Sequence, residues 1–130
     1  MLQIYIPSSA KNFKIEIAVV DADKVKRRLI FHAGAAKGIV SNPLHARIPI
    51  NQFKRDVWLN MSIDVFAFAH YCFKQINVKG IDLINLSSSC KLRRIFTMRS
   101  PLYDSDIDSS KTLQQALDRL TMEEFGGDSS

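Results

Sequence analysis

The first third of the chain alternates apolar and polar residues with a period of two, the pattern of half-buried β-strands. Leu2–Ile6 alternates in this way until Pro7 ends the segment. Phe13–Val20 repeats the alternation, and Asp21–Asp23 forms a turn that leads into Val25–His32. We therefore predict a short strand followed by a β-hairpin.

Further strands are predicted in the middle of the chain. Leu44–Ile50 alternates, but Pro49 lacks a backbone donor, so we expect this strand to lie at a sheet edge or to end there. Val57–Val65 has the clearest alternation, with an aliphatic row on one face and Trp58 on the other. Ile81–Leu86 predicts another strand.

Two segments leave the period of two for a helical pattern. Asp64–Phe73 is rich in alanine and phenylalanine and predicts a short helix, with Ser62 or Asp64 as its N-cap. Thr112–Gln115 has the spacing of a capping box, and a leucine stripe follows it. We therefore predict an amphipathic helix over Leu113–Phe125, which at about three turns is stable only when it docks on something.

The last predicted strand, Lys91–Thr97, carries an unusual density of cations. Strict alternation puts Leu92 and Phe96 on one face, where we expect them to anchor the strand in the core. The same rule puts Arg94 on that face, as a charge paired near the sheet edge. Lys91 and Arg93 fall on the other face and are the better candidates for partner contacts.

These elements predict a mainly β protein, an antiparallel β-sandwich with one short helix and a C-terminal helix. We assign residues 1–100 to the sandwich and residues 101–130 to an acidic linker and the short amphipathic helix. The linker, Asp104–Ser110, has the composition of a disordered segment.

Charge is distributed unevenly between these two parts. Residues 1–100 contain 16 Lys and Arg against 6 Asp and Glu, a net +10, whereas residues 101–130 contain 2 against 7, a net −5. A basic folded part favours a polyanionic partner such as nucleic acid, an acidic membrane surface or an acidic protein surface. No apolar run reaches the roughly 18 residues of a membrane-spanning helix, and the N-terminus lacks the features of a signal peptide. We expect a cytoplasmic protein.

The residue types that carry catalysis are scattered. His32, His45 and His70 fall in three different predicted elements, without metal-ligand spacing and without a nucleophile motif. Cys72 and Cys90 lack the companions of a metal site or a disulfide scaffold. We expect no enzyme activity, no cofactor, no metal and no small-molecule substrate.

The candidate contact residues are the six cations of two strands, and three interpretations of them stay open. They can form a solvated sheet face whose charges discourage edge pairing, track the phosphates of a nucleic acid, or attach to an acidic protein surface. A carbohydrate-binding or hydrolytic sandwich is a further alternative, which requires an exposed aromatic platform at Trp58. The six residues are Lys26, Arg27, Arg28, Lys91, Arg93 and Arg94.

Four stretches in this order resemble the cilia- and flagella-associated protein 20 domain family, most closely its longer members. They are Val25–Leu29, Pro43–Pro49, the strand led by Trp58 with its following helix, and Cys90–Thr97. The resemblance spans residues 2–97. It implies a jelly-roll β-sandwich without enzymatic activity.

The resemblance also implies a place in the cell and a class of partner. It points to a structural module of the cilium or flagellum, basal body or centriole that associates with tubulin or with axonemal or centriolar proteins. Nucleic acid is the alternative partner, and neither a membrane nor a small molecule is expected. The family's domain has further strands before the position where this chain begins, so the resemblance implies a sandwich that is incomplete at its N-terminus.

Overall fold

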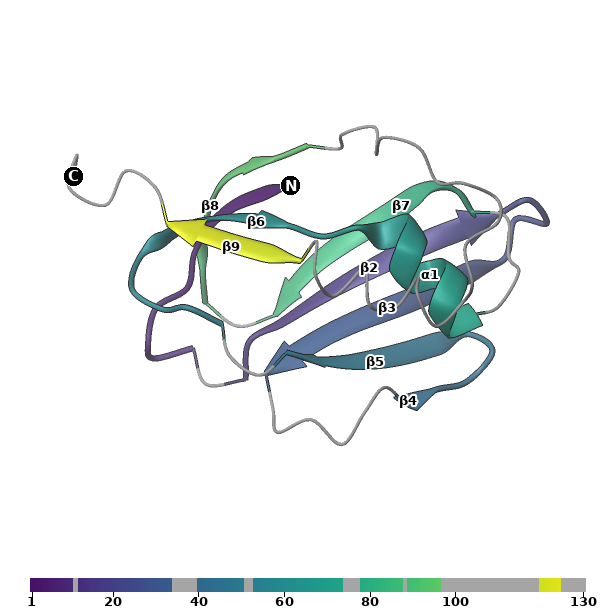
Figure 1. The fold of residues 1–130 in the computed structure, drawn as a ribbon, viewed down its shortest axis with the longest axis horizontal. Helices are drawn as coiled ribbons and strands as arrows, with labels where there is room; N and C mark the ends of the chain where they lie inside the picture. The colour runs from purple at the N-terminus through teal and green to yellow at the C-terminus, as the bar shows by residue number, and fades with distance from the viewer. Residues whose placement is uncertain are drawn as a thin grey trace.

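Two β-sheets pack face to face in the computed structural model, which describes residues 1–10, 12–33, 40–50, 53–73, 78–87, 89–96 and 120–124. The four-stranded sheet has the order β8-β1-β6-β9, and the five-stranded sheet has the order β4-β5-β3-β2-β7 (Figure 1). The four-stranded sheet consists of β1 (Leu2–Tyr5), β6 (Trp58–Ser62), β8 (Lys91–Ile95) and β9 (Thr121–Glu124). The five-stranded sheet consists of β2 (Lys14–Asp21), β3 (Lys26–Ala33), β4 (Val40–Ser41), β5 (His45–Ile50) and β7 (Val78–Ser87).

The core between the sheets comes from the aliphatic rows that the alternation predicts. The inward apolar side chains of β1, β2, β3 and β6 are buried to 2% exposure or less, because both layers cover them. These predictions are confirmed, as is the hairpin, in which β2 and β3 pair antiparallel from Lys14 and His32 to Val20 and Lys26. The buried residues of these strands include Leu2, Ile4, Ile15, Ile17, Val19, Leu29, Phe31, Leu59 and Met61.

The single helix of the described residues, α1 (Val65–Phe73), lies along β3 on the core side of the five-stranded sheet. The Asp64 carboxylate accepts a hydrogen bond from the backbone N–H of Ala67, 3.2 Å away, which confirms Asp64 as the N-cap. Phe68 is fully buried, and its ring meets Phe31 edge to face with centroids 5.1 Å apart. The helix therefore belongs to the core.

The prediction of a purely antiparallel sandwich is wrong at one pair, because β3 and β5 run parallel. The connection from Ala33 to His45 is long enough to carry the chain back to the start of β3, which a parallel pair requires. β5 is also not the outermost strand, since the two-residue β4 pairs with Ala46 and Arg47. Pro49 lies beyond that pairing, so its missing donor removes no bond to β4.

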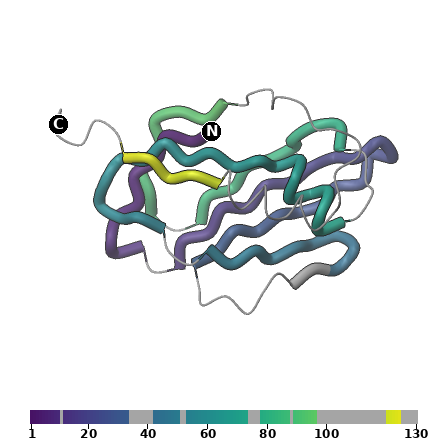
Figure 2. The backbone as a smooth tube through the Cα atoms, in the orientation of Figure 1, coloured from purple at the N-terminus to yellow at the C-terminus, as the bar shows by residue number. Residues whose placement is uncertain are grey.

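The C-terminal helix predicted over Leu113–Phe125 is not seen among the described residues. Thr121–Glu124 instead forms β9, which pairs antiparallel with β6 (Figure 2). The strand gains ladder hydrogen bonds and brings Met122 opposite the core residue Met61, a tertiary gain that local helical spacing cannot reveal. Leu120 is described and lies in neither a helix nor a strand, whereas residues 113–119, residue 125 and the acidic linker Asp104–Ser110 lie outside the described residues.

We expect Phe68→Ala to lower the free energy of unfolding by about 3–5 kcal/mol, because it opens a cavity against Phe31. Phe66→Ala is the matched control, since Phe66 lies on the same helix with 44% of its surface exposed, and we expect a change within about 0.5 kcal/mol. Urea titration followed by circular dichroism measures both. Equal losses for the two variants would contradict this packing of α1.

Candidate interaction surface

The three consecutive cations of β3 do not point the same way. Leu29 and Phe31 face the core, so the alternation of the strand turns Arg27 toward that side as well. Lys26 and Arg28 turn toward the outer face of the five-stranded sheet. A run of three cations is thus divided between the inside and the outside of the sandwich.

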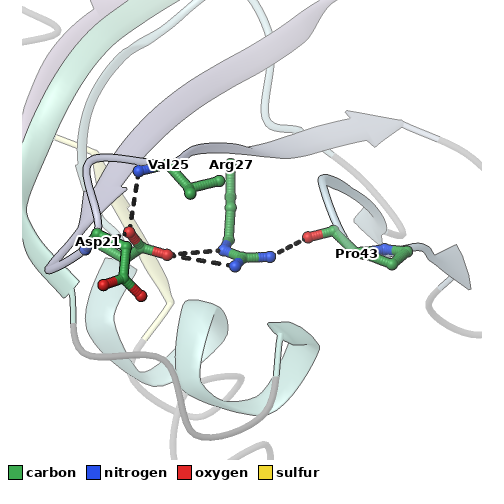
Figure 3. A network of polar contacts seen from close by, with 5 residues as sticks. Asp21, Val25, Arg27 and Pro43 are labelled. Carbon is green, nitrogen blue, oxygen red and sulfur yellow. Dashed lines mark hydrogen bonds and ion pairs between the residues drawn. The ribbon is translucent and has the colours of Figure 1, made fainter.

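Arg27 belongs to a polar network at the end of the β2–β3 hairpin (Figure 3). Its Nη2 and Nε lie 3.2 and 3.3 Å from Oδ2 of Asp21, and its Nη1 donates to the carbonyl oxygen of Pro43. The guanidinium carbon lies 5.7 Å from the ring centroid of Phe73 at the end of α1. Arg27 therefore joins the hairpin, the segment before β5 and the helix.

Asp21 is the only charged residue buried among the described part of the chain, with 6% of its surface exposed. Its Oδ1 accepts hydrogen bonds from the backbone N–H groups of Val25 and Asp23, both at 2.9 Å. The hydrogen bond from Val25 lowers the pKa of the carboxyl most, and the hydrogen bond and charge of Arg27 lower it further against the opposing effect of burial. Asp21 is thus held ionised, with Arg27 as its counter-ion.

The two outward cations of β3 are also neutralised within their own sheet. Lys26 Nζ lies 3.2 Å from Oδ2 of Asp82 on β7, and Arg28 Nη1 lies 3.5 Å from Oε1 of Glu16 on β2. Exposed pairs of this kind contribute little to stability, but they reduce the local positive potential. Lys26 and Arg28 remain accessible, whereas the Arg27 side chain is only 18% exposed and has a structural task.

The strand β8 differs from β3 in the exposure of its side chains. All residues of Lys91–Phe96 are exposed, and we call this segment the β8 surface. The expected core anchors are wrong, because Leu92 is 45% and Phe96 39% exposed. β8 is an outer strand of its sheet and pairs only with β1 among the described strands, so a strand of its own sheet flanks it on one side only.

A register shift also breaks the alternation on which that expectation depended. Ile4 of β1 pairs with Leu92 and the preceding Gln3 with Arg94, so that Arg93 is the extra residue of a β-bulge. Leu92 and Ile95, three positions apart, consequently lie on the core side of the sheet, beside Ile4 and Leu2. The same shift places Lys91 and Arg94 together on the outer face.

The β8 surface carries three cations, Lys91, Arg93 and Arg94. No carboxylate of the described residues forms an ion pair with Lys91, Arg93 or Arg94. Lys91 Nζ instead lies 5.3 Å from the ring centroid of Tyr5, and the Tyr5 ring lies 5.8 Å from that of Trp58. This arrangement combines three accessible positive charges with two half-buried aromatic rings.

The two basic strands do not form one continuous basic patch. β3 lies inside the five-stranded sheet, whereas β8 runs along the outer rim of the four-stranded sheet (Figure 1). Sequence reasoning treated the two runs alike and missed Tyr5 as a neighbour of Lys91. The available signal was the alternation of β1 and β6, which turns Tyr5 and Trp58 to the outer face together.

The aromatic pair bears on the carbohydrate interpretation. Trp58 is only partly buried, so the burial that would exclude this interpretation is not found. The Tyr5 and Trp58 planes are inclined by 56°, and the pair therefore does not form a flat stacking platform. The geometry gives this alternative no specific support.

Of the two cysteines, Cys90 directly precedes Lys91 of the β8 surface, and Cys72 lies in α1. No group of three metal-binding side chains occurs in the described ranges, and none of their helices is long and apolar enough to span a bilayer. Burial raises the pKa of the Cys72 thiol to about 12 and also raises the pKa of Cys90. Both thiols are therefore held in the protonated, weakly nucleophilic form.

The described residues thus form a β-sandwich with an accessible basic outer strand. The model of the CFA20 domain matches residues 1–114. The chain belongs to the CFA20 domain family, whose members are cilia- and flagella-associated and generally non-catalytic. This confirms the resemblance seen in the sequence.

We expect Asp21→Asn to lower the melting temperature at neutral pH, because it removes the buried counter-ion of Arg27. It should also flatten the acid dependence of stability. The native pKa of Asp21 is lowered, so its stabilisation is full above the unfolded carboxyl pKa of about 3.9 and is lost as the pH falls through the native value.

Thermal melts between neutral and acidic pH, followed by circular dichroism, test this expectation. Asp23→Asn is the control, since Asp23 is exposed in the same turn. If the two variants have the same acid profile, Asp21 is not the group that links folding to pH.

We expect both cysteines to react slowly with a thiol reagent in the folded protein and rapidly after denaturation. Cys90→Ser leaves Cys72 alone, and that thiol should be the slower of the two because its burial is greater. The absorbance change with a chromogenic disulfide measures the rates. A fast native reaction of Cys90→Ser would contradict the burial of Cys72.

Proposed function

We propose that this protein is a non-catalytic interaction module of cilia, basal bodies or centrioles, and that it attaches to an acidic protein surface such as the microtubule lattice through the β8 surface. Family membership supports the ciliary setting. The partner and the contact residues are our inference from the charge and exposure of the described strands.

One observation carries this proposal, the contrast between the two basic strands. Arg27 has a buried counter-ion, and Lys26 and Arg28 have carboxylates within 3.2 and 3.5 Å. The cations of β8 lack such partners among the described residues. Accessible cations without an ion-pair partner produce a positive potential outside the protein, and at low salt this potential attracts an approaching anionic surface.

The overall charge supports the same kind of partner. Residues 1–100 have a net charge of +10, so an acidic surface experiences long-range attraction before any specific contact forms. Attachment through exposed Lys and Arg weakens as salt shortens the Debye length to about 10 Å at 0.1 M. The proposal therefore includes a strong dependence on ionic strength.

Nucleic acid is the second candidate partner, favoured by the row of Lys91, Tyr5 and Trp58. Cations that track phosphates beside aromatic rings that stack on bases are the features of single-strand binding. Phe31 is buried against α1 and is not available for stacking. The protein partner is preferred because it agrees with the family's ciliary association.

We expect the protein to co-sediment with stabilised microtubules at low salt and Arg93→Ala/Arg94→Ala to weaken this binding about tenfold, since two exposed charge contacts of up to about 1 kcal/mol each are lost. Lys26→Ala/Arg28→Ala removes the same charge from β3 and should change the binding less than about threefold. Pelleting curves at two salt concentrations measure the affinities.

Equal losses in the two double variants would show that only net charge matters and would remove β8 as the site. Absence of pelleting by the unmodified protein at low salt would overturn direct microtubule binding. Filter binding to single-stranded and duplex probes tests the second candidate, which requires a salt-dependent affinity.

A further inference from the structure

The strand β8 has one backbone edge that no other described strand covers. β1 lies between β8 and β6, whereas β8 pairs with β1 alone. An outer strand of this kind presents backbone N–H and C=O groups to any chain that can lie beside it. β8 therefore offers a surface for main-chain pairing as well as for charge contacts.

The hydrogen bonds at the end of the β1–β8 ladder show which groups point outward. The N–H of Phe96 donates to the carbonyl of Met1 at 3.0 Å, and the N-terminal amine of Met1 donates to the carbonyl of Phe96 at 2.9 Å. The polar groups of successive residues alternate in direction along a strand. Those of Ile95 consequently point away from β1.

The side chains along this edge are separated by character. Leu92 and Ile95 lie on the core side and are 45% and 40% exposed. Lys91 and Arg94 lie on the outer face, where Lys91 also lies over the Tyr5 ring. A strand laid beside β8 would therefore meet apolar side chains on one face and cations on the other.

We propose that β8 accepts an extended acidic segment of a partner protein by strand addition, the segment alternating apolar and acidic side chains. This inference rests on the proposed function only in taking the partner to be an acidic protein. Main-chain bonds to Ile95 supply affinity, and the two faces of the added strand supply specificity. The bulge at Arg93 limits the pairing to a short segment.

The charges of β8 argue against the same edge of a second copy as the occupant. Two β8 strands side by side would bring Lys91, Arg93 and Arg94 against cations of the same kind, which is unfavourable. Charges on an outer strand also discourage pairing with neutral chains. An acidic strand is attracted to the same cations, so the edge favours pairing with acidic strands over pairing with basic or neutral ones.

The test uses the full chain, labelled for NMR, and two synthetic probes. The first is a capped peptide of alternating glutamate and valine, and the second has lysine in place of glutamate. We expect the glutamate peptide to slow hydrogen exchange of the Ile95 amide at least about tenfold at saturation, as a new ladder bond requires. The lysine peptide should leave this amide unchanged.

Charge reversal provides a variant that distinguishes specific pairing from loss of folding. Arg93→Glu/Arg94→Glu should lose binding of the glutamate peptide and gain binding of the lysine peptide. Lys26→Ala/Arg28→Ala, on the other sheet, should keep the preference of the unmodified protein. If Arg93→Glu/Arg94→Glu fails to fold, it binds neither peptide. Arg93→Gln/Arg94→Gln then serves as the second variant, and a reduced affinity for the glutamate peptide, without a gain of binding to the lysine peptide, supports the proposal.

Two outcomes overturn the inference. Chemical-shift changes at Arg93 and Arg94 without protection of Ile95 would show a surface charge contact rather than strand addition. The peptide-free protein could instead form a dimer in sedimentation velocity, with its Ile95 amide protected from hydrogen exchange. That result would show that a second copy occupies the edge. Binding of the glutamate peptide without binding to microtubules would refute the proposed lattice partner and support strand addition. Binding to microtubules without binding of the glutamate peptide would refute strand addition and leave the lattice partner standing.

Discussion

The buried ion pair of Asp21 and Arg27 is the interaction on which the arrangement of the charged residues depends. A carboxylate with 6% exposure requires a counter-ion and hydrogen bonds, and the turn supplies both through Val25, Asp23 and Arg27. Because Arg27 also bonds to Pro43 and lies near Phe73, the pair fixes the hairpin against the strand β5 and the helix α1. Breaking it leaves a buried charge without a partner and loosens three elements together.

This pair also determines where the protein can carry an external interaction. Arg27, the central cation of β3, is held inside the fold by its ion pair with Asp21. The flanking cations Lys26 and Arg28 form ion pairs with carboxylates on the neighbouring strands β7 and β2. Of the cations on the two basic strands, those without such partners in the described structure are therefore the ones on β8. A sequence-level count cannot make this distinction, because Lys26–Arg28 and Lys91–Arg94 look alike until the strands that flank them are known.

The success of sequence reasoning follows how local each determinant is. The buried rows of β1, β2 and β6 and the Asp64 cap were predictable, since they depend on residues two to four positions apart. The β8 surface was only half predictable: its cations were found, but the bulge at Arg93 moved Leu92 and Ile95 to one face. β9 and the parallel pairing of β5 depend on partners distant in the sequence, so their local patterns were misleading.

The composition of β8 itself favours a partner over a purely protective edge. If its cations served only to prevent unwanted pairing, polar side chains would suffice between them. The β8 surface instead exposes Leu92, Ile95 and Phe96 at 45%, 40% and 39%. Exposed apolar side chains along an outer strand increase the risk of association. Exposed apolar side chains next to three cations fit an edge that an acidic partner chain covers. The apolar side chains then contribute to the same interface as the charges.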